Sequence, residues 1–232
     1  MSDPTQFSDT LSRSEFLAGI SKHEHTNILG RGKRIKLNKG KILFREGDPA
    51  IRIYIVLKGR LKLYKLHEQG KEAIIRYINC DELTAAIAVF KNKAYPVTAE
   101  TVGEVEVIGW DKATMHKLML EYAPIAINML NAAISRIDDL QTRYLELCTE
   151  QVEQRVGRSL LRIMKQSGRK TKDGILIDFK LSRQDLADYT GTTLFTVSRI
   201  LSNWEKTGWI KSGRERITIT DPHALVSFSE LG

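Results

Sequence analysis

Cysteine and proline are scarce in this 232-residue sequence, which has two cysteines and five prolines. Cys80 and Cys148 lie in different predicted elements, so the sequence predicts neither a disulfide framework nor a cysteine metal cluster. Two reduced thiols are typical of a cytoplasmic protein. The five histidines have no zinc-like spacing with cysteine, and we expect no metal site.

Long apolar runs are also missing. Residues 1–14 are polar and include acidic side chains, so they do not resemble a signal peptide. No run approaches the length of a membrane span, and we therefore expect a cytoplasmic protein without a membrane partner. The sequence also lacks a nucleophile with a base at plausible spacing and a glycine-rich phosphate loop. These absences argue against an enzyme.

Positive charge, by contrast, is in excess. The chain has 36 lysines and arginines against 28 aspartates and glutamates, a net charge of +8. From Gln151 onward there are 14 basic and 9 acidic residues, so a net of +5 lies in about the last third. A basic surface attracts anions, and nucleic acid is the first partner to consider. A merely soluble basic protein is the alternative, because charge alone is weak support.

Short apolar segments separated by glycine fill residues 33–110. Ile51, Ile53, Ile55 and Leu57 alternate with other residues, which predicts one apolar face of a half-buried strand. Many short strands at this spacing favour an antiparallel barrel or roll. The predicted strands cover residues 41–45, 51–57, 61–66, 73–78, 97–101 and 105–110.

Helical patterns precede and follow these strands. We expect a short helix over 14–29, a helix capped by Asp111 that continues to Tyr122, and a long helix from Pro124 to Cys148. Apolar residues recur on the long helix at spacings of four and three, with Ile134 beside them. This stripe consists of Leu130, Ala133, Ile137, Leu140, Tyr144 and Leu147. It predicts a seam that pairs two subunits, and the alternative is a helix that lies on its own β-domain.

The sequence after the long helix begins with another helix near 149–166, which Ser167 and Gly168 end. An exposed basic loop is predicted next, and residues 175–179 alternate as a strand. The loop carries Arg169, Lys170 and Lys172.

Residues 182–204 have the pattern of two helices joined by a tight turn. Ser182 is a good N-cap for a helix that ends at Thr190-Gly191, and a second helix follows over 192–204. The residues expected to pack the two helices together are Leu186, Ala187, Val197, Ile200 and Leu201. The remaining face of the second helix is then free. Residues 209–220 complete a two-stranded wing whose turn carries Arg214 and Arg216.

A free helix of this kind fits the major groove of DNA, where residues near its N-terminus reach base edges. Arg199 is the best candidate to contact a guanine, because its guanidinium matches the two guanine acceptors, and Ser198 lies beside it. The base-reading set also includes Leu194 and Phe195. The side chains suited to backbone phosphates are Ser182, Arg183, Gln184, Thr192, Thr193 and Arg214.

Two passages make the sequence similar to the CRP/FNR regulators, the family of the cyclic-AMP receptor protein and the fumarate-and-nitrate-reduction regulator. Residues 40–48, running on to 54–59, resemble the sensor roll of this family, and 181–210 resembles its helix-turn-helix. The resemblance covers about residue 25 to residue 222.

This resemblance implies an α+β protein. Its N-terminal antiparallel β-roll is of jelly-roll type, similar to cyclic-nucleotide-binding domains, and a long dimerisation helix and a C-terminal winged helix-turn-helix follow. We therefore divide the chain into a β-roll sensor domain with flanking helices at 1–122, a dimerisation helix at 123–148 and a DNA-binding domain at 149–232. The resemblance also implies a homodimer that controls promoters in response to a signal, with RNA polymerase as a partner.

Departures from the family pattern bear on the effector. Cyclic-nucleotide binders have a Gly-Glu pair for the ribose where this chain has Ala85-Ala86, and Arg-Ser for the phosphate where it has Pro96-Val97-Thr98. A buried anion without a countercharge costs roughly several kcal/mol, so cyclic AMP is disfavoured. The iron–sulfur cluster of the oxygen-sensing branch needs four cysteines and is disfavoured as well.

The effector is therefore left open, and the resemblance is closer to relatives with an apolar pocket, including those that sense nitric oxide through haem. The expected pocket lining is Ile75, Tyr77, Ala85, Ala86, Phe90, Val97, Thr98 and Ile134. His23 or His25 is the candidate axial ligand of a haem, and an ordinary surface histidine is the alternative for each. Where relatives commonly carry Glu, the recognition segment has Phe195, which favours a different operator and contact with a thymine methyl.

Two functions compete on these grounds. In the first, an effector shifts the dimer helix and changes the spacing of two recognition helices, which bind a palindromic site with half-sites about 34 to 36 Å apart. In the second, the chain is a ligand-binding module or a hydrolase whose C-terminal domain contacts proteins instead of DNA. Steep weakening of DNA binding by salt favours the first.

Overall fold

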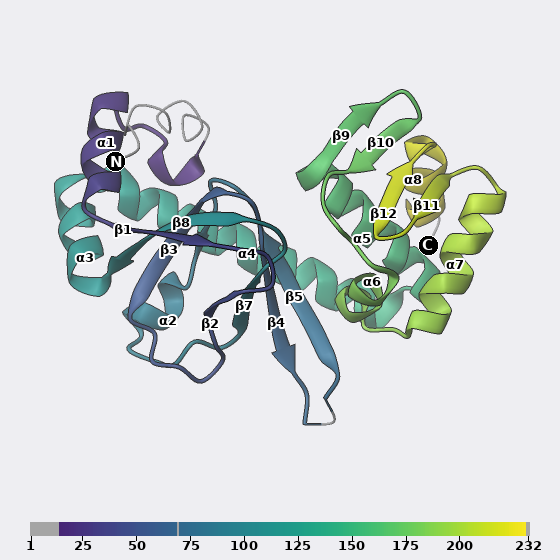
Figure 1. The fold of residues 1–232 in the computed structure, drawn as a ribbon, viewed down its shortest axis with the longest axis horizontal. Helices are drawn as coiled ribbons and strands as arrows, with labels where there is room; N and C mark the ends of the chain where they lie inside the picture. Colours follow the sequence, from purple (N-terminus) through teal and green to yellow (C-terminus); the bar gives the residue numbers. More distant parts are fainter. Residues whose placement is uncertain (1–13, 69, 231–232) are drawn as a thin grey trace. The chain divides into compact units, whose positions relative to one another are not determined.

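The structure, a computed structural model, describes residues 14–68 and 70–230. Within these residues it contains two compact units: residues 14–65 together with Ile75–Asp139, and Leu66–Ile74 together with residues 140–230. The first unit contains the larger sheets, and the second is mainly helical with a small sheet (Figure 1). The boundary between the units falls inside the long helix that the sequence predicts.

Two four-stranded sheets form the first unit, apart from Leu66 and residues 72–74 of their strands, which fall within the second unit. Their strands are β1 (Lys33–Leu37), β2 (Ile42–Phe44), β3 (Arg52–Lys58), β4 (Leu61–Leu66), β5 (Glu72–Ile78), β6 (Leu83–Thr84), β7 (Thr98–Thr101) and β8 (Val105–Asp111). The strand order is β1-β8-β3-β6 in one sheet and β2-β7-β4-β5 in the other. The predicted antiparallel roll is confirmed, and all six predicted strands are present within about two residues at each end.

β3 differs from the half-buried strand that the sequence pattern predicts. Five successive side chains from Ile53 to Leu57 are buried, whereas Ile51 lies before the strand and is 58% exposed. β3 lies between β8 and β6, and the helices α2 (Ala86–Phe90) and α3 (Lys112–Glu121) also contact it. A strand covered on both faces buries consecutive residues, so the alternation of apolar residues did not mark a solvent face.

The single helix predicted over 14–29 is wrong. The chain instead forms a 3₁₀ turn at Glu15–Leu17 and a separate helix, α1 (Lys22–Gly30). Ser21 caps α1 through a reciprocal pair of bonds: its hydroxyl accepts from the Glu24 N–H, and the Glu24 carboxylate accepts from the Ser21 N–H. This capping box makes the helix begin at Lys22, later in the chain than the Ser14 start that the sequence pattern suggested.

The long predicted helix is α4 (Ala123–Thr149), which follows α3 directly. Asp111 caps α3 as predicted, by accepting from the Thr114 N–H at 2.8 Å. Ile125 of α4 is fully buried in the core of the first unit. Across residues 14–68 and 70–230, no single helix is long and apolar enough to cross a membrane, and only α3 and α4 taken together, bent by 114°, meet that criterion.

The second unit contains the predicted helix pair and wing. Its elements are α5 (Val152–Ser167), β9 (Gly168–Thr171), β10 (Gly174–Ile177), α6 (Arg183–Thr190), α7 (Leu194–Lys206), β11 (Ile210–Gly213), β12 (Arg216–Ile219) and α8 (Pro222–Glu230). The sheet order is β11-β12-β10-β9. The basic loop predicted after α5 is wrong in part, because Arg169 and Lys170 pair with Leu176 and Ile175 as strand β9, and Lys172 lies in the turn.

Candidate DNA-binding site and effector pocket

Local hydrogen bonds and one glycine form the turn between α6 and α7. The Ser182 N–H donates to the Asp185 carboxylate at 3.0 Å, and the Ser182 hydroxyl accepts from the Asp185 N–H at 2.9 Å. At the other end, the Thr190 hydroxyl donates to the Leu186 carbonyl at 2.7 Å. Gly191 then adopts a φ of +66°, a conformation that favours glycine. The predicted helix and turn are therefore determined by nearby residues.

The predicted contact between the two helices is buried. Its residues are Leu186, Ala187, Val197, Ile200 and Leu201, and none is more than 4% exposed. α6 contacts α7, and the Trp204 indole of α7 donates to the Glu153 carboxylate of α5 at 3.0 Å. These contacts fix the inward face of α7, and its opposite face is left at the surface.

The four predicted base-reading residues lie on this outward face. Phe195 is 79% exposed and Leu194 is 46% exposed. Arg199 is exposed, and Ser198 beside it is half-buried. Phe195 and Arg199 are four residues apart, as are Leu194 and Ser198, so each pair shares one side of the helix. α7 thus presents a polar and apolar surface near its N-terminus.

The predicted phosphate contacts lie on α6, on the turn and on the wing. Arg183 donates to the Ser212 hydroxyl of β11 at 3.0 Å, and Gln184 donates to the Asp188 carboxylate at 2.7 Å. Thr192 is half-buried, Arg214 is exposed at the wing turn, and Thr193 caps α7 by accepting from the Thr196 N–H at 3.1 Å. Because the Ser182 and Thr193 hydroxyls serve as helix caps, the N–H groups at the helix starts and the arginines are better placed for phosphate.

Two contacts hold the wing against the helix-turn-helix. The Glu205 carboxylate of α7 accepts from the N–H and the hydroxyl of Ser212 at 2.9 and 3.0 Å. These bonds, the backbone one foremost, hold the pKa of Glu205 below its ordinary value. The Leu181 N–H donates to the Glu215 carbonyl in the wing turn at 3.2 Å. The wing therefore has a fixed position relative to α6 and α7.

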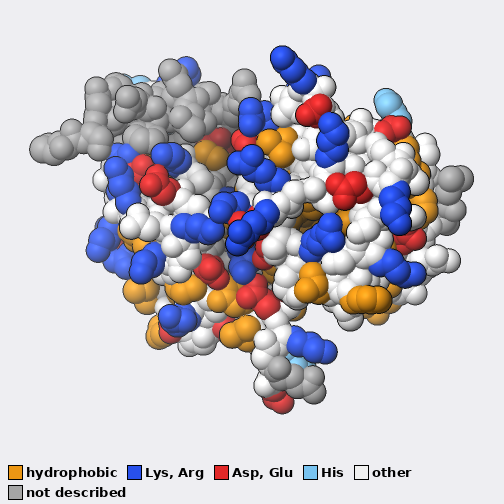
Figure 2. Space-filling view, turned by 45° about the vertical axis from the view of Figure 1, so that its right-hand side comes forward, with side chains coloured by type: hydrophobic (Ala, Val, Ile, Leu, Met, Phe, Trp, Pro, Cys, Tyr) orange, Lys and Arg blue, Asp and Glu red, His pale blue; other side chains and the backbone are white. Residues whose placement is uncertain are grey.

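Positive charge does not by itself mark the site. Lys and Arg side chains are spread over the face seen in Figure 2, with acidic side chains among them. Some of the basic residues of the second unit are paired, as Lys211 is with Asp173 at 3.2 Å and Arg169 is with Asp178 at 3.5 Å. The exposed helix face is therefore the more specific feature.

The predicted apolar stripe of α4 is largely at the surface. Leu130, Ile134, Ile137, Leu140, Tyr144 and Leu147 are between 48% and 67% exposed, and Ala133 is half-buried. The start of the helix instead packs on its own unit, where the Asn128 amide donates to the Phe16 and Ala18 carbonyls at 3.0 and 2.9 Å. So many exposed large apolar side chains on one helix indicate an interaction surface.

The residues predicted to line the effector pocket all belong to the first unit. Tyr77 and Thr98 are buried, and Ile134 is 48% exposed. The half-buried members are Ile75, Ala85, Ala86, Phe90 and Val97. The Thr98 hydroxyl already accepts from the Glu46 N–H at 3.0 Å, so it is used to hold the backbone.

Arg136 is a residue of this region that the sequence analysis did not select. It comes from α4, and its guanidinium donates to the carbonyl of Leu83, two residues before Ala85. Burial, with the nearby charge of Arg76, lowers the pKa of Arg136 to about 10. Arg76 itself pairs with Glu82 at 2.5 Å. The sequence predicts that an anion here meets no guanidinium because positions 96–98 contain no arginine. The structure places the Arg136 guanidinium in this region from a distant part of the chain.

His25 corrects the expectation of a surface histidine, because it is only 4% exposed, whereas His23 is exposed. Its Nε2 lies 3.1 Å from the Ile20 carbonyl, and its Nδ1 is buried without a hydrogen-bond partner in the described part of the chain. Burial raises the pKa of the Cys80 thiol to about 11, and Cys148 is exposed. Among residues 14–68 and 70–230, no three His, Cys, Asp or Glu side chains form a group able to hold a metal ion.

Comparison with known families finds two matches in the chain. Residues 34–122 match the cyclic nucleotide-binding domain, and residues 154–228 match the Crp-like helix-turn-helix domain. These ranges contain the β-roll and the winged helix-turn-helix, respectively.

Curated relatives match most of the chain. A global nitrogen regulator of Synechococcus elongatus is 29% identical over 194 residues, which cover 82% of this chain and 86% of the relative. A CRP-like cAMP-activated global transcriptional regulator of Mycobacterium tuberculosis is 20% identical over 217 residues, covering 94% and 97%. Both relatives are thus matched over nearly their whole length.

Solved structures show the same fold. FixK2 from Bradyrhizobium japonicum has a TM-score of 0.74 at 21% identity, and the match covers 84% of this chain and 96% of FixK2. A CooA mutant from Carboxydothermus hydrogenoformans has a TM-score of 0.75 at 19% identity, covering 93% and 94%. The predicted architecture of β-roll, long helix and winged helix-turn-helix is confirmed.

Proposed function

The chain belongs to the CRP/FNR family of transcription regulators, and we propose that it binds a palindromic DNA operator as a homodimer whose affinity an effector controls. As a member of this family, it is a sequence-specific DNA-binding regulator. The rival idea, a ligand-binding module whose C-terminal domain contacts proteins, is not favoured, because that domain is a Crp-like helix-turn-helix.

The outward face of α7 is the observation that carries the proposal. Arg199 and Phe195 are exposed on a helix whose other face is buried against α6. A helix held in this way can enter the major groove, where a guanidinium donates two hydrogen bonds to guanine and an aromatic edge contacts a thymine methyl. Ser198 and Leu194 extend the same surface. The N–H groups at the starts of α6 and α7, with Arg183 and Arg214, are suited to backbone phosphates.

The exposed stripe of α4 supports a homodimer. Two copies of this helix can pair through Ile137, Leu140 and Tyr144, which removes large apolar side chains from water on both subunits. A two-fold axis along the seam gives two recognition helices, so the operator has two inverted half-sites about 34 to 36 Å apart.

The effector site we propose lies beside β6 and α4 in the first unit. Arg136 carries a half-buried positive charge there and donates to the Leu83 carbonyl. An anionic group of the effector would replace that carbonyl as the partner of Arg136, because a charged acceptor binds a guanidinium more strongly than a neutral one. Ile137 of the dimer stripe follows Arg136 directly, so movement of this arginine reaches the seam.

Cyclic AMP and haem are less suited to this site. A ribose would meet Ala85 and Ala86, which offer no carboxylate to its hydroxyls. The His25 Nε2 is already directed at the Ile20 carbonyl, which leaves only the buried Nδ1 to ligate a haem iron. His23 is exposed and gives a haem no buried ligand. We therefore propose an anionic effector of another kind, held without a metal centre.

Two further parts of the proposal follow from the family. RNA polymerase is the protein partner we propose for the DNA-bound dimer, because a promoter-binding regulator acts on transcription through it. The cytoplasm is the proposed location, in keeping with free thiols at Cys80 and Cys148.

Selection from a random DNA pool tests the proposal. The purified protein should enrich one palindromic sequence, and its affinity for that sequence should fall steeply between 50 and 200 mM salt, by about 10³-fold or more for six or more phosphate contacts. A protein that enriches no sequence, or binds with affinity that salt does not change, would not be a DNA-binding regulator.

A further inference from the structure

A cleft of about 730 Å³ opens in the sheet of the second unit. β10 and β12 pair only at Ile175 with Ile219 and at Leu176 with Thr218, and beyond Leu176 the two strands no longer pair. The far end of the gap is closed where the Leu181 N–H donates to the Glu215 carbonyl. The cleft is therefore part of the fold: β10 and β12 separate beyond Leu176, and the hydrogen bond between Leu181 and Glu215 closes its far end.

The floor and the rim of this cleft differ in chemistry. Leu176, Ile177 and Phe179 supply an apolar surface, and the rim carries charged side chains. These charged side chains are Arg169, Lys180, Arg214, Arg216, Asp178 and Glu215. Four cations face two carboxylates, so the lining has a net charge of +2.

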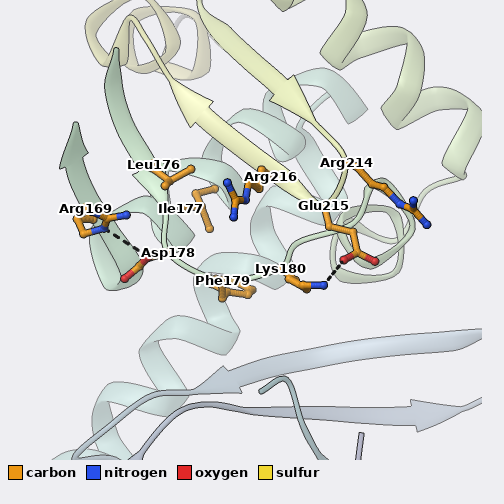
Figure 3. A pocket seen from close by; sticks show the side chains of 9 residues that line it. All are labelled: Arg169, Leu176, Ile177, Asp178, Phe179, Lys180, Arg214, Glu215 and Arg216. Atoms are coloured by element: carbon orange, nitrogen blue, oxygen red, sulfur yellow. Dashed lines mark ion pairs between the residues drawn. The ribbon is translucent and has the colours of Figure 1, made fainter. Parts of the chain in front are cut away.

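Both carboxylates are already paired. Asp178 contacts Arg169 at 3.5 Å, and Glu215 contacts Lys180 at 3.2 Å. Within the described part of the chain, the side chains of Arg214 and Arg216 form no hydrogen bond or ion pair. Figure 3 shows Arg216 near the middle of the ring of lining residues, close to Ile177, whereas Arg214 points outward at the wing turn. Arg216 is thus the unpaired charge at the centre of the cleft.

We propose that this cleft binds an organic phosphate with a flat aromatic body, at a site distinct from the base-reading face of α7 and from the effector pocket, with only Arg214 shared with the proposed contacts to backbone phosphates. A volume of about 730 Å³ lies within the range of about 300 to 1,000 Å³ typical of small-molecule sites. The guanidinium of Arg216 matches two oxygens of a phosphate, and the apolar floor with Phe179 receives the aromatic body. A DNA backbone would use the charge of the rim but would leave the apolar floor without a partner.

Isothermal titration calorimetry of the full chain without DNA tests this inference independently of DNA binding. ADP is the probe, and adenosine and inorganic phosphate are its two halves. We expect saturable binding of ADP, with each half binding at least about tenfold more weakly, because only ADP engages both the rim and the floor. Absence of saturable ADP binding up to millimolar concentration would overturn the inference.

Matched variants locate the binding. Arg216→Gln should weaken ADP binding about tenfold or more, whereas Lys172→Gln, which removes an equal charge from the neighbouring turn, should change it less than about twofold. Arg169→Gln provides a second lining variant if Arg216→Gln does not fold, and we expect it to weaken ADP binding about threefold. Equal effects of the cleft variants and Lys172→Gln would mean unspecific attraction and would refute a site here.

Discussion

Arg143 of α4 contacts Tyr189, the penultimate residue of α6, in two ways at once. Its guanidinium donates to the Tyr189 carbonyl at 3.1 Å and lies 4.4 Å from the centre of the Tyr189 ring. The Tyr189 carbonyl lies just before the turn at Gly191, so one side chain of the long helix holds the C-terminal end of the first DNA-binding helix. Movement of α4 therefore has a direct physical route to the helix-turn-helix.

Arg143→Ala should destabilise the second unit by about 1 to 2 kcal/mol, because a charged hydrogen bond and a cation–π contact are lost together. Urea unfolding followed by the fluorescence of Trp204 and Trp209 measures this, with Trp110→Phe as a shared background. Gln141→Ala, two residues away and exposed, is the control and should have no effect beyond about 0.5 kcal/mol. Equal stability of both variants would show that the contact contributes nothing.

Arg199→Ala should lower discrimination among DNA sites by about 1 to 3 kcal/mol and leave the dimer intact, because the guanidinium is exposed and free to contact a base. Competition between the selected operator and single-base variants measures the change. The matched control is Lys206→Ala at the exposed end of α7. This variant should leave the discrimination among DNA sites unchanged, because any loss of affinity should be the same for every sequence. An Arg199→Ala protein that retains full discrimination would assign base reading to other residues.

The winged helix-turn-helix could be predicted from the sequence because its structural determinants are local. Ser182 and Asp185 cap each other across three residues, and Gly191 supplies the left-handed turn. The short β6 had no such local signal, whereas α8 had one that the sequence analysis did not use: Asp221 caps it by accepting from the Ala224 N–H at 2.9 Å, and Pro222 is its first residue. Only the packing of α8 depends on distant residues, as where the Phe228 ring lies 6.0 Å from the Trp204 ring.

Residues that meet only through tertiary structure were not predictable in the same way. Arg136 follows Ala133 of the apolar stripe by three residues, yet its burial depends on contact with Leu83, 53 positions earlier. His25 is buried because α1 packs against the roll, where Ile28 is fully buried and its carbonyl accepts from the Trp110 indole at 3.0 Å. No pattern within either segment indicates these partners. The exposed face of α7, in contrast, follows from its helical periodicity.

Arg136→Met should raise the stability of the first unit in the absence of effector, by about 1 to 2 kcal/mol. Burial lowers the pKa of Arg136 to about 10, so keeping this side chain charged at neutral pH costs the folded state free energy. Arg136→Met removes this cost, and the loss of the hydrogen bond to the Leu83 carbonyl offsets only part of the resulting gain in stability. Arg76→Met has the opposite expected sign, since it leaves the Glu82 carboxylate without its ion pair. Urea unfolding at pH 7 compares the two, and a loss of stability in Arg136→Met would contradict a net cost of burial.

Acidification should loosen the wing through Glu205. The folded-state pKa of Glu205 lies below its unfolded value, so its contribution to stability is present above the unfolded pKa and is lost as the pH falls through the folded one. The difference in unfolding free energy between the wild type and Glu205→Gln should therefore be constant at neutral pH and shrink below about pH 4. A difference that does not change with pH would mean that the carboxylate charge is not what binds Ser212.

Ile137→Glu should break the proposed dimer. Ile137 is 54% exposed on one subunit, and pairing would bury it twice, once from each copy. Burial of the exposed half of each side chain contributes about 1 to 1.5 kcal/mol, and a carboxylate in the seam adds a desolvation cost of about several kcal/mol, so the dimer dissociation constant should rise at least about 100-fold. Sedimentation equilibrium measures this directly. Ser135→Glu adds the same charge at an exposed position outside the stripe and should leave the constant within about threefold. If Ile137→Glu remains dimeric while Ser135→Glu becomes a monomer, the subunits pair through a different face of α4.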